Sequence, residues 1–470
     1  MRHERYRGNE AGENEDDYEL RAYELRMTVS RTVCLGFLSV IIVGTIGLMM
    51  PFSTSSGTWN DPIVALFTST SAVCVTGLAV VDTGTYFSFW GQFIVVALVQ
   101  IGGLGYMTAT TFILLLLGGK FRLKDKVAIQ QALDRTEMND SAQLIRSIIA
   151  VTLIFEITGI FLLLPVFAPK YGLDEGLWLA IFHSISSWNN AGFSLFKDNL
   201  IGYQTSVLLN LVVTVLIIFG GIGYQVILEM YLWGRDRLQR KPQWIVFSLD
   251  FKVATSTTLL LLVIGTILFF FIERRNPETI GYLSLKDKLL VAWFQSVTPR
   301  TAGFNTIDLS KMTTAGLFVM LAFMFVGASP GGTGGGMKTT TLRVLTSCTK
   351  SILQGKEEVF LYRRKISLTL ILKAVGVLIG SVGTVILATI LIAVTDPNLD
   401  FIQILFETVS AFATVGLSTG ITASVSAFAK LILVVTMFVG RVGILLLMAA
   451  VLGDPRPSSI HYPEENLLVG

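Results

Sequence analysis

The sequence is poor in charged residues and in the side chains that build catalytic and metal sites. Only 15% of its 470 residues are Asp, Glu, Lys or Arg, and it has three histidines and three cysteines. So few charges exclude an ordinary water-soluble globule of this length. Because Cys34, Cys74 and Cys348 lie far apart and His is scarce, we expect no disulfide framework, no metal-ligand cluster and no enzyme activity.

The chain also lacks an excess of charge of one sign. It has 36 Lys and Arg against 33 Asp and Glu, for a formal net charge of +3. Nucleic-acid binding needs a basic surface that neutralises phosphates. We therefore expect no nucleic-acid partner.

Hydrophobic length is what the sequence has in abundance, since 52% of its residues are hydrophobic. A helix needs about 20 apolar residues to cross a bilayer core of about 30 Å. The sequence therefore predicts an all-α polytopic membrane protein, in contact with membrane lipid, with eight transmembrane helices. Runs of spanning length occur at about 32–50, 91–117, 145–168, 205–233, 251–272, 312–347, 367–394 and 428–452.

A shorter stretch lies between the two members of each pair of long runs. These stretches are too short to cross a bilayer, which predicts four re-entrant pore helices. They lie at about 62–74, 175–188, 287–298 and 400–413. Each ends in a short glycine motif: Val75-Thr76-Gly77-Leu78, Asn190-Ala191-Gly192-Phe193, Thr301-Ala302-Gly303-Phe304 and Thr414-Val415-Gly416-Leu417.

The spacing within these stretches indicates a true internal repeat. A phenylalanine precedes the motif glycine by ten residues in three of the four stretches, and Phe294 precedes Gly303 by nine. We therefore expect four pseudo-symmetric helix–pore-helix–helix repeats around one central pore, with a slightly distorted third pore segment. Their ranges are 32–117 (repeat one), 145–233 (repeat two), 251–347 (repeat three) and 367–452 (repeat four), between an N-terminal tail at 1–31 and a C-terminal tail at 453–470.

Orientation follows from the distribution of Lys and Arg. The loops between repeats are richer in these residues than the loops within repeats. The positive-inside rule then places both tails in the cytoplasm and the glycine motifs in the external half of the membrane.

Irregular backbone survives at membrane depth only where protein buries it or water reaches it. Four glycine loops that meet on one axis could turn their carbonyls inward and replace the hydration shell of a cation. Glycine suits this role because it accepts positive φ and leaves room for an ion. The alternative for a single motif is an ordinary glycine-capped turn at a helix end. The fourfold repetition favours the ion site.

A glycine-rich run at 327–341 interrupts the second helix of repeat three. Interior Gly and Pro are unfavourable in a helix, so we expect a break there, and we interpret the run as a gate. A phosphate-binding loop is excluded because Met337 separates Gly336 from Lys338 and because no strand precedes the run. The alternative is that residues 338–341 begin a cytoplasmic half-helix. The predicted gate residues are Gly327, Gly331, Gly332, Gly334, Gly335, Gly336 and Lys338, together with Arg441.

Two ionisable residues lie within the apolar runs. Arg441 is in the middle of the last run, where an arginine costs at least ~2.5 kcal/mol, so we expect it to face a watery cavity or carbonyls such as those of the gate. Glu407 follows Phe406 in the fourth pore helix. It either attracts cations at the pore mouth or bonds a neighbouring repeat.

Three of these motifs resemble hallmarks of the Trk/Ktr/HKT superfamily of potassium transporters: Thr301-Ala302-Gly303-Phe304, the run Gly331–Thr339, and Gly440-Arg441-Val442-Gly443. Within it the chain looks most similar to the membrane subunits of bacterial Ktr systems, over about residues 32–452. The resemblance implies that K⁺ binds the filter carbonyls, that the loop at 327–341 gates conduction, and that glycine at position 77 favours potassium over sodium.

The resemblance also implies partners that the chain does not contain. It implies a homodimer in the plasma membrane, resting on a KtrA-like cytosolic ring of regulators of potassium conductance. ATP or ADP would act on that ring and Na⁺ would stimulate flux, while this chain itself holds no cofactor. The basic loops at 234–241 and 348–366 are plausible docking surfaces. The rival function is a coupled alternating-access transporter of a small solute, but such proteins usually have two large repeats, often inverted.

Overall fold

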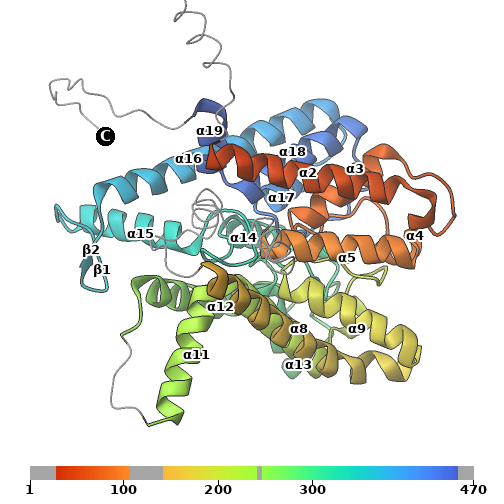
Figure 1. The fold of residues 1–470 in the computed structure, drawn as a ribbon, viewed down its shortest axis with the longest axis horizontal. Helices are drawn as coiled ribbons and strands as arrows, with labels where there is room; N and C mark the ends of the chain where they lie inside the picture. Colours follow the sequence, from red (N-terminus) through yellow and green to blue (C-terminus); the bar gives the residue numbers. More distant parts are fainter. Residues whose placement is uncertain (1–27, 106–140, 241–245, 454–470) are drawn as a thin grey trace, which may run out of the picture.

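The computed structural model describes residues 28–105, 141–240 and 246–453 of the chain, and most of these residues are helical (Figure 1). Four of the described helices are long and apolar enough to cross a membrane: α2 (Val29–Met49), α8 (Ser141–Tyr171), α12 (Leu249–Glu273) and α16 (Leu368–Thr395). Only 28% of each apolar window is buried within the protein. The exposed remainder is apolar, as a lipid-facing surface must be. The all-α, multi-pass membrane fold is confirmed.

Each long helix packs against a short, more deeply buried helix that follows it in the chain. These short helices are α3 (Pro62–Val73), α9 (Leu173–Trp188), α13 (Leu285–Val297) and α17 (Phe401–Phe412). Local sequence explains where they begin: Asp61 caps α3 by accepting hydrogen bonds from the backbone N–H groups of Ile63 and Val64, and Ser284 caps α13. They match the four predicted pore helices in position.

The second helix of each repeat is shorter than a full span. These helices are α5 (Phe89–Leu104), α10 (Val207–Ile222), α14 (Thr314–Phe325) and α18 (Ala427–Val442). The chain bends by 104° between α10 and α11 (Tyr224–Leu238), and by 96° between α18 and α19 (Ile444–Leu452). Gly223 and Gly443 make these breaks at φ of 98° and 88°, a conformation that suits only glycine.

The predicted continuous second helices over 205–233 and 428–452 are therefore wrong, because each is divided by a bend at a glycine. By length and composition the described residues hold four spans, or up to six when each bent pair counts as one. In repeat three, α14 ends at Phe325 and the chain becomes helical again only in α15 (Thr339–Leu353), so the predicted break is present. The end of the 91–117 run lies outside the described residues.

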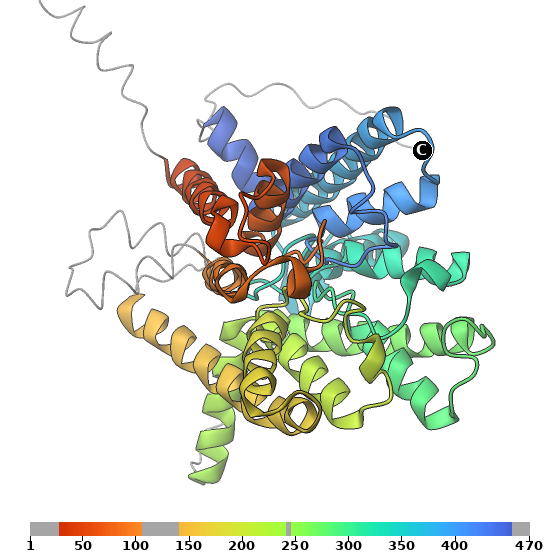
Figure 2. The ribbon, with the colours of Figure 1, turned by 90° about the vertical axis from the view of Figure 1, so that its right-hand side faces the viewer.

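The four repeats close into a ring. The second helix of each repeat packs on the pore helix of the next: α5 on α9, α10 on α13, α14 on α17, and α18 back on α3. Figure 2 shows the result, with the first elements (red) beside the last (blue). Short elements complete the chain: η1 (Pro51–Ser53), α4 (Thr83–Tyr86), η2 (Ile201–Tyr203), η3 (Leu309–Lys311), and a hairpin of β1 (Phe360–Leu361) with β2 (Arg364–Lys365).

Candidate ion site and gate loop

The four glycine motifs, here called filter segments, share one unusual backbone conformation. The first residue of each is left-handed although it is not glycine: φ is 56° at Val75, 58° at Asn190, 64° at Thr301 and 51° at Thr414. The motif glycines are also left-handed, with φ between 68° and 90°. Left-handed non-glycine residues cost of order 1–3 kcal/mol and persist only where surrounding structure imposes them. Because the same strained conformation occurs in all four segments, we infer that all four serve the same structural role.

The filter segments meet one another in a closed cycle. A Cβ added to any motif glycine would point at the carbonyl oxygen of the residue that precedes the glycine of the next repeat. The neighbouring carbonyls are those of Ala191 for Gly77, Ala302 for Gly192, Val415 for Gly303 and Thr76 for Gly416. At Gly192 and Gly303 the distances to that Cβ would be 2.8 and 2.5 Å. The structure therefore brings all four predicted filter segments together around one axis.

A hydroxyl near the end of each pore helix holds its filter segment. The N–H groups of Gly77 and Gly416 donate to Oγ of Ser71 and Ser410 at 3.0 and 3.1 Å. In the other two repeats the hydroxyls of Ser186 and Thr298 donate to the carbonyls of Phe193 and Phe304. Our sequence reasoning missed these residues. The signal was available, since a hydroxyl precedes the motif glycine by six residues in three repeats and by five in repeat three.

A second brace joins each pore helix to the segment after its filter, at a spacing of eleven residues. His183 Nε2 lies 3.0 Å from Ser194 Oγ, and Gln295 Nε2 donates to Thr306 Oγ1 at 3.2 Å. In repeat four the hydroxyl of Ser418 donates to the Glu407 carboxylate. The matching residue of repeat one is Thr68, whose hydroxyl has no hydrogen-bond partner among the described residues.

These contacts settle how Glu407 is used. Its carboxylate is 1% exposed and also accepts a hydrogen bond from Thr422 Oγ1 at 3.0 Å. Both partners, Ser418 and Thr422, belong to its own repeat, so the predicted bond to a neighbouring repeat is wrong. So deep a carboxylate does not lie open at a pore mouth.

Repeat three is distorted as its shorter spacing predicts. The N–H of the second filter residue reaches back five residues in the other repeats, to the carbonyls of Ser71, Ser186 and Ser410. In repeat three the N–H of Ala302 instead reaches back four residues, to Thr298, at 3.0 Å. The missing residue therefore tightens the turn from pore helix to filter.

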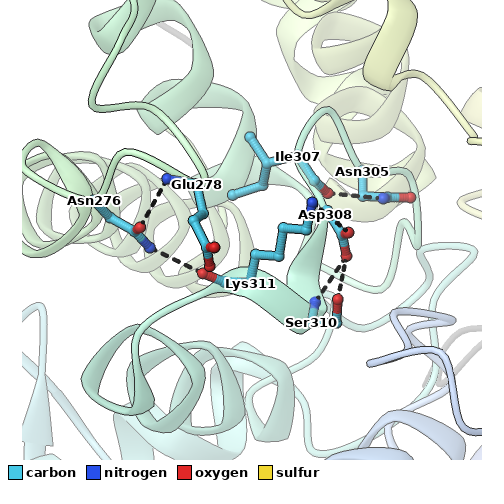
Figure 3. A network of polar contacts seen from close by, with 7 residues as sticks. All are labelled: Asn276, Glu278, Asn305, Ile307, Asp308, Ser310 and Lys311. Atoms are coloured by element: carbon cyan, nitrogen blue, oxygen red, sulfur yellow. Dashed lines mark hydrogen bonds and ion pairs between the residues drawn. The ribbon is translucent and has the colours of Figure 1, made fainter.

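A polar network supports the chain that follows the third filter segment (Figure 3). Asn305 Nδ2 donates to the carbonyl of Ile307 at 2.9 Å, and Asp308 accepts from the N–H and hydroxyl of Ser310. Asn276, at the other side of the repeat, donates to the carbonyl of Lys311 at 2.9 Å. Polar contacts of side chains thus hold this stretch, whose only regular element is the short η3.

The predicted gate loop lies directly against the filter segments of repeats three and four. The N–H of Gly335 donates to Thr414 Oγ1 at 3.0 Å, and a Cβ at Gly334 would collide with Thr301 Oγ1. At the root of the loop Val326 pairs with Met337, and the N–H of Gly327 donates to the Met337 carbonyl at 2.8 Å. The glycines therefore permit the close approach between loop and filter.

Broken second helices hold the other side of the loop. A helix end leaves carbonyls without an intrahelical partner. The carbonyls of Gly220 and Gly221, at the end of α10, accept from the N–H groups of Thr333 and Ser329 at 3.1 and 3.0 Å. The carbonyl of Gly440, near the end of α18, accepts from Gly336 at 3.4 Å. The breaks in the second helices therefore supply the acceptors that position the loop.

Arg441 joins this loop to two other repeats. Its Nη1 donates to the carbonyl of Thr333 in the loop and its Nη2 donates to the carbonyl of Gly102 near the end of α5. The guanidinium therefore faces carbonyls inside the protein, as expected. Lys338 donates to Gly334 at 2.7 Å and is the residue that caps α15. Residues 339–341 form the first turn of α15, so they are helical and the irregular loop ends at Lys338.

Comparison with known proteins agrees with this arrangement. The family described as TrkH, cation transport protein, matches residues 17–462. The Ktr system potassium uptake protein B of Bacillus subtilis (strain 168) is 38% identical over 447 residues, 95% of this chain and 98% of the relative. The potassium/sodium uptake protein NtpJ of Enterococcus hirae is 35% identical over 450 residues, 95% and 98% of the two chains.

The fold also has a solved counterpart. The crystal structure of the potassium transporter TrkH from Vibrio parahaemolyticus matches with a TM-score of 0.69 and 20% identity, over 92% of this chain and 86% of that one. The fold and site define a multi-pass helical membrane protein whose four filter segments meet at one axis. The chain belongs to the TrkH family of cation transport proteins.

Proposed function

We propose that this chain takes up potassium through a pore whose filter is the ring of carbonyls at residues 75–78, 190–193, 301–304 and 414–417. The closed cycle of left-handed glycines carries the proposal. The four segments have the same strained conformation, and each contacts the next. Such a ring of backbone can present carbonyl oxygens that replace the hydration shell of a cation. The names of the relatives, which are potassium uptake proteins, support the choice of ion.

The gate in this proposal is the loop from Gly327 to Lys338. It lies against two of the four filter segments, and Arg441 holds its Thr333 carbonyl. A loop held by hydrogen bonds to backbone carbonyls, with six glycines and one proline, can detach without unfolding a helix. Its displacement would open the path on that side of the filter.

Regulation requires a second polypeptide in this proposal. We place the protein in the plasma membrane as a homodimer with cytoplasmic termini, on a cytosolic ring of nucleotide-binding subunits to which ATP or ADP binds. Sodium stimulates flux in the same scheme. The β1–β2 hairpin and the last residues of α15 lie in the basic stretch 348–366 that would face such a ring, and their position after the gate loop supports this role.

Rubidium tracer uptake tests the proposal. The purified chain in proteoliposomes, under an imposed membrane potential, is compared with the chain that lacks residues 331–336. We expect uptake in at least the deletion variant, with potassium as a strong competitor and sodium as a weak one. Silence of both proteins, or uptake coupled to a solute at fixed stoichiometry, would instead favour the alternating-access transporter.

A further inference from the structure

Arg300 precedes the third filter segment and is 4% exposed. The ion pairs found among the described residues all join other side chains. Its Nε and Nη1 have no hydrogen-bond partner among the described residues. A buried guanidinium with so few bonds costs free energy, and a well-packed apolar side chain is often equally stable or better. Stability therefore does not explain an arginine at this position.

The backbone of Arg300 is part of the filter assembly. Its carbonyl accepts a hydrogen bond from Asn190 Nδ2 of the second filter segment at 3.1 Å. Its N–H donates to the carbonyl of Val297, the last residue of α13, at 3.0 Å. Thr301, next in the chain, is the left-handed first residue of the third filter segment. A change in the filter at this point therefore moves the Cα of Arg300.

The side chain of Arg300 reaches the root of the gate loop instead. Its Nη2 donates to the carbonyl of Val326 at 2.9 Å. Val326 directly follows Phe325, the last residue of α14, and pairs with Met337 across the root. A charged donor to a helix-end carbonyl makes a strong hydrogen bond. The bond therefore holds the gate loop at the point where it leaves α14.

A small cavity lies beside this bond. Arg300 lines this cavity together with Gly327, Ala328, Ser329 and Thr339 of the loop and its continuation, and Gly221 of α10. Close-packed interiors resist displacement, whereas residues beside a cavity have fewer partners to disturb. Hydrogen bonds hold the root of the loop. One joins Gly327 to Met337 within the root, and another comes from the side chain of Arg300, next to the filter.

We infer that Arg300 is a positioning residue that couples the third filter segment to the root of the gate loop. Arg441 holds the loop at Thr333 from repeat four, and Arg300 holds it at Val326 from repeat three. The two arginines differ in how they are connected to the filter. Only Arg300 is bonded directly along the backbone to a filter segment, through Thr301. The inference rests on the proposed function, since it assigns roles to the same filter and loop.

The test measures rubidium uptake by four proteins: wild type, Arg300→Met, the deletion of residues 331–336, and the two changes combined. We expect Arg300→Met to raise uptake by about tenfold in the full loop, since the loss of a hydrogen bond to a charged group is worth about a factor of ten or more. In the deletion background we expect a change of about twofold or less. Arg300→Lys, which keeps the charge and a donor, should give an intermediate increase.

Arg343→Met, a cation on α15 in the same repeat, is the matched control, and its effect should be the same in both backgrounds. Equal effects of Arg300→Met in both backgrounds, or no effect in either, would overturn the inference while the proposed function stands. Absence of uptake from wild type and deletion alike would instead overturn the proposed function.

A measurement on the unaltered protein covers the case in which Arg300 variants do not fold. Amide hydrogen exchange is compared in potassium and in sodium. We expect exchange at residues 326–329 to change with the ion, because the filter and the root are joined through Arg300. Identical exchange at these amides in the two ions would overturn the inference.

Discussion

The carbonyl of Thr333 in the gate loop accepts a hydrogen bond from Nη1 of Arg441, a residue 108 positions later in the chain. The other end of the guanidinium binds the carbonyl of Gly102, which is 339 positions from Arg441. One side chain therefore ties the loop of repeat three to helices of repeats four and one. In the proposed gating, the hydrogen bond from Arg441 to Thr333 has to break before the loop can move away from the filter.

Arg441→Gln is expected to raise the uptake of the isolated chain. A hydrogen bond from a charged donor contributes about 1.5–3 kcal/mol, so the loss of the bond to Thr333 should favour the open loop by about tenfold or more. The measurement is rubidium uptake at matched protein density. Lys430→Gln, on the outer part of the same helix, is the control. Equal uptake by both variants would show that Arg441 does not latch the loop.

Gly77→Ser is expected to lower the preference for potassium over sodium, by about tenfold. The new Cβ would meet the carbonyl of Ala191 in the next filter segment, at a φ of 90°, and left-handed strain alone is worth about 1–2 kcal/mol. Competition of sodium and potassium against rubidium measures the preference. Gly420→Ser is the matched control, because Gly420 has a φ of 96° but open space where the Cβ would lie. Unchanged preference in Gly77→Ser would count against this filter.

Deletion of residues 331–336 is expected to raise uptake and to weaken its dependence on the cytosolic regulator. The deletion removes Gly335 and the Thr333 carbonyl, and with them the contacts to Thr414 and Arg441. It keeps Val326 and Met337, the two residues that pair at the root of the intact loop. Uptake with and without the regulator and nucleotide is the measurement. Reduced uptake by a well-folded deletion variant would contradict the assignment of this loop as the gate.

Glu407→Ala is expected to destabilise the protein by about 1–3 kcal/mol, because it removes the acceptor of the partly buried Ser418 hydroxyl and one of the two acceptors of Thr422. Thr68→Val is the control at the matching position of repeat one. The Thr68 hydroxyl has no partner among the described residues, so its removal should be neutral or stabilising. Thermal unfolding in detergent compares the two. A larger loss for Thr68→Val than for Glu407→Ala would contradict the brace.

The Asp396 carboxylate, just beyond the end of α16, is expected to make stability depend on acid. It accepts from the N–H of Ser426 at 2.9 Å and from its hydroxyl at 2.7 Å, at the start of α18. Burial acts to raise the pKa of Asp396, but the hydrogen bonds of Ser426 and Thr395 and the nearby Lys430 hold it below its usual 3.8. A lowered folded-state pKa means that the contribution is complete at neutral pH and is lost as pH falls through that lowered value.

Thermal unfolding of Asp396→Asn against wild type measures this contribution. Because the carboxylate is partly exposed, we expect a loss on the order of 1 kcal/mol or less at neutral pH. The difference should shrink once the pH is below 3.8. Asp400→Asn is the control, since the Asp400 side chain makes no capping hydrogen bond to α17. A difference that stays constant with pH would show that the charge of Asp396 is not involved.

Local sequence was enough to locate several parts of the site. The pore helices end a few residues before Gly77, Gly192, Gly303 and Gly416, and α14 breaks where the glycine-rich run begins. Positive φ and close approach are demands that glycine meets at its own position. The partners of Glu407 and the bends at Gly223 and Gly443 were not foreseen. A glycine is compatible with a straight helix as well as with a bent one, and the surroundings decide between them.

The sequence by itself determined the membrane class, the four pore helices and the four filter motifs, because hydropathy, run length and the conformational freedom of glycine are properties of short segments. Only the tertiary structure decided which atoms meet. The bond from Arg300 to Val326 spans 26 residues and that from Arg441 to Gly102 spans 339. Such partners depend on how the repeats close into a ring, and on which helix-end carbonyls the breaks leave unpaired. No local pattern encodes those distances.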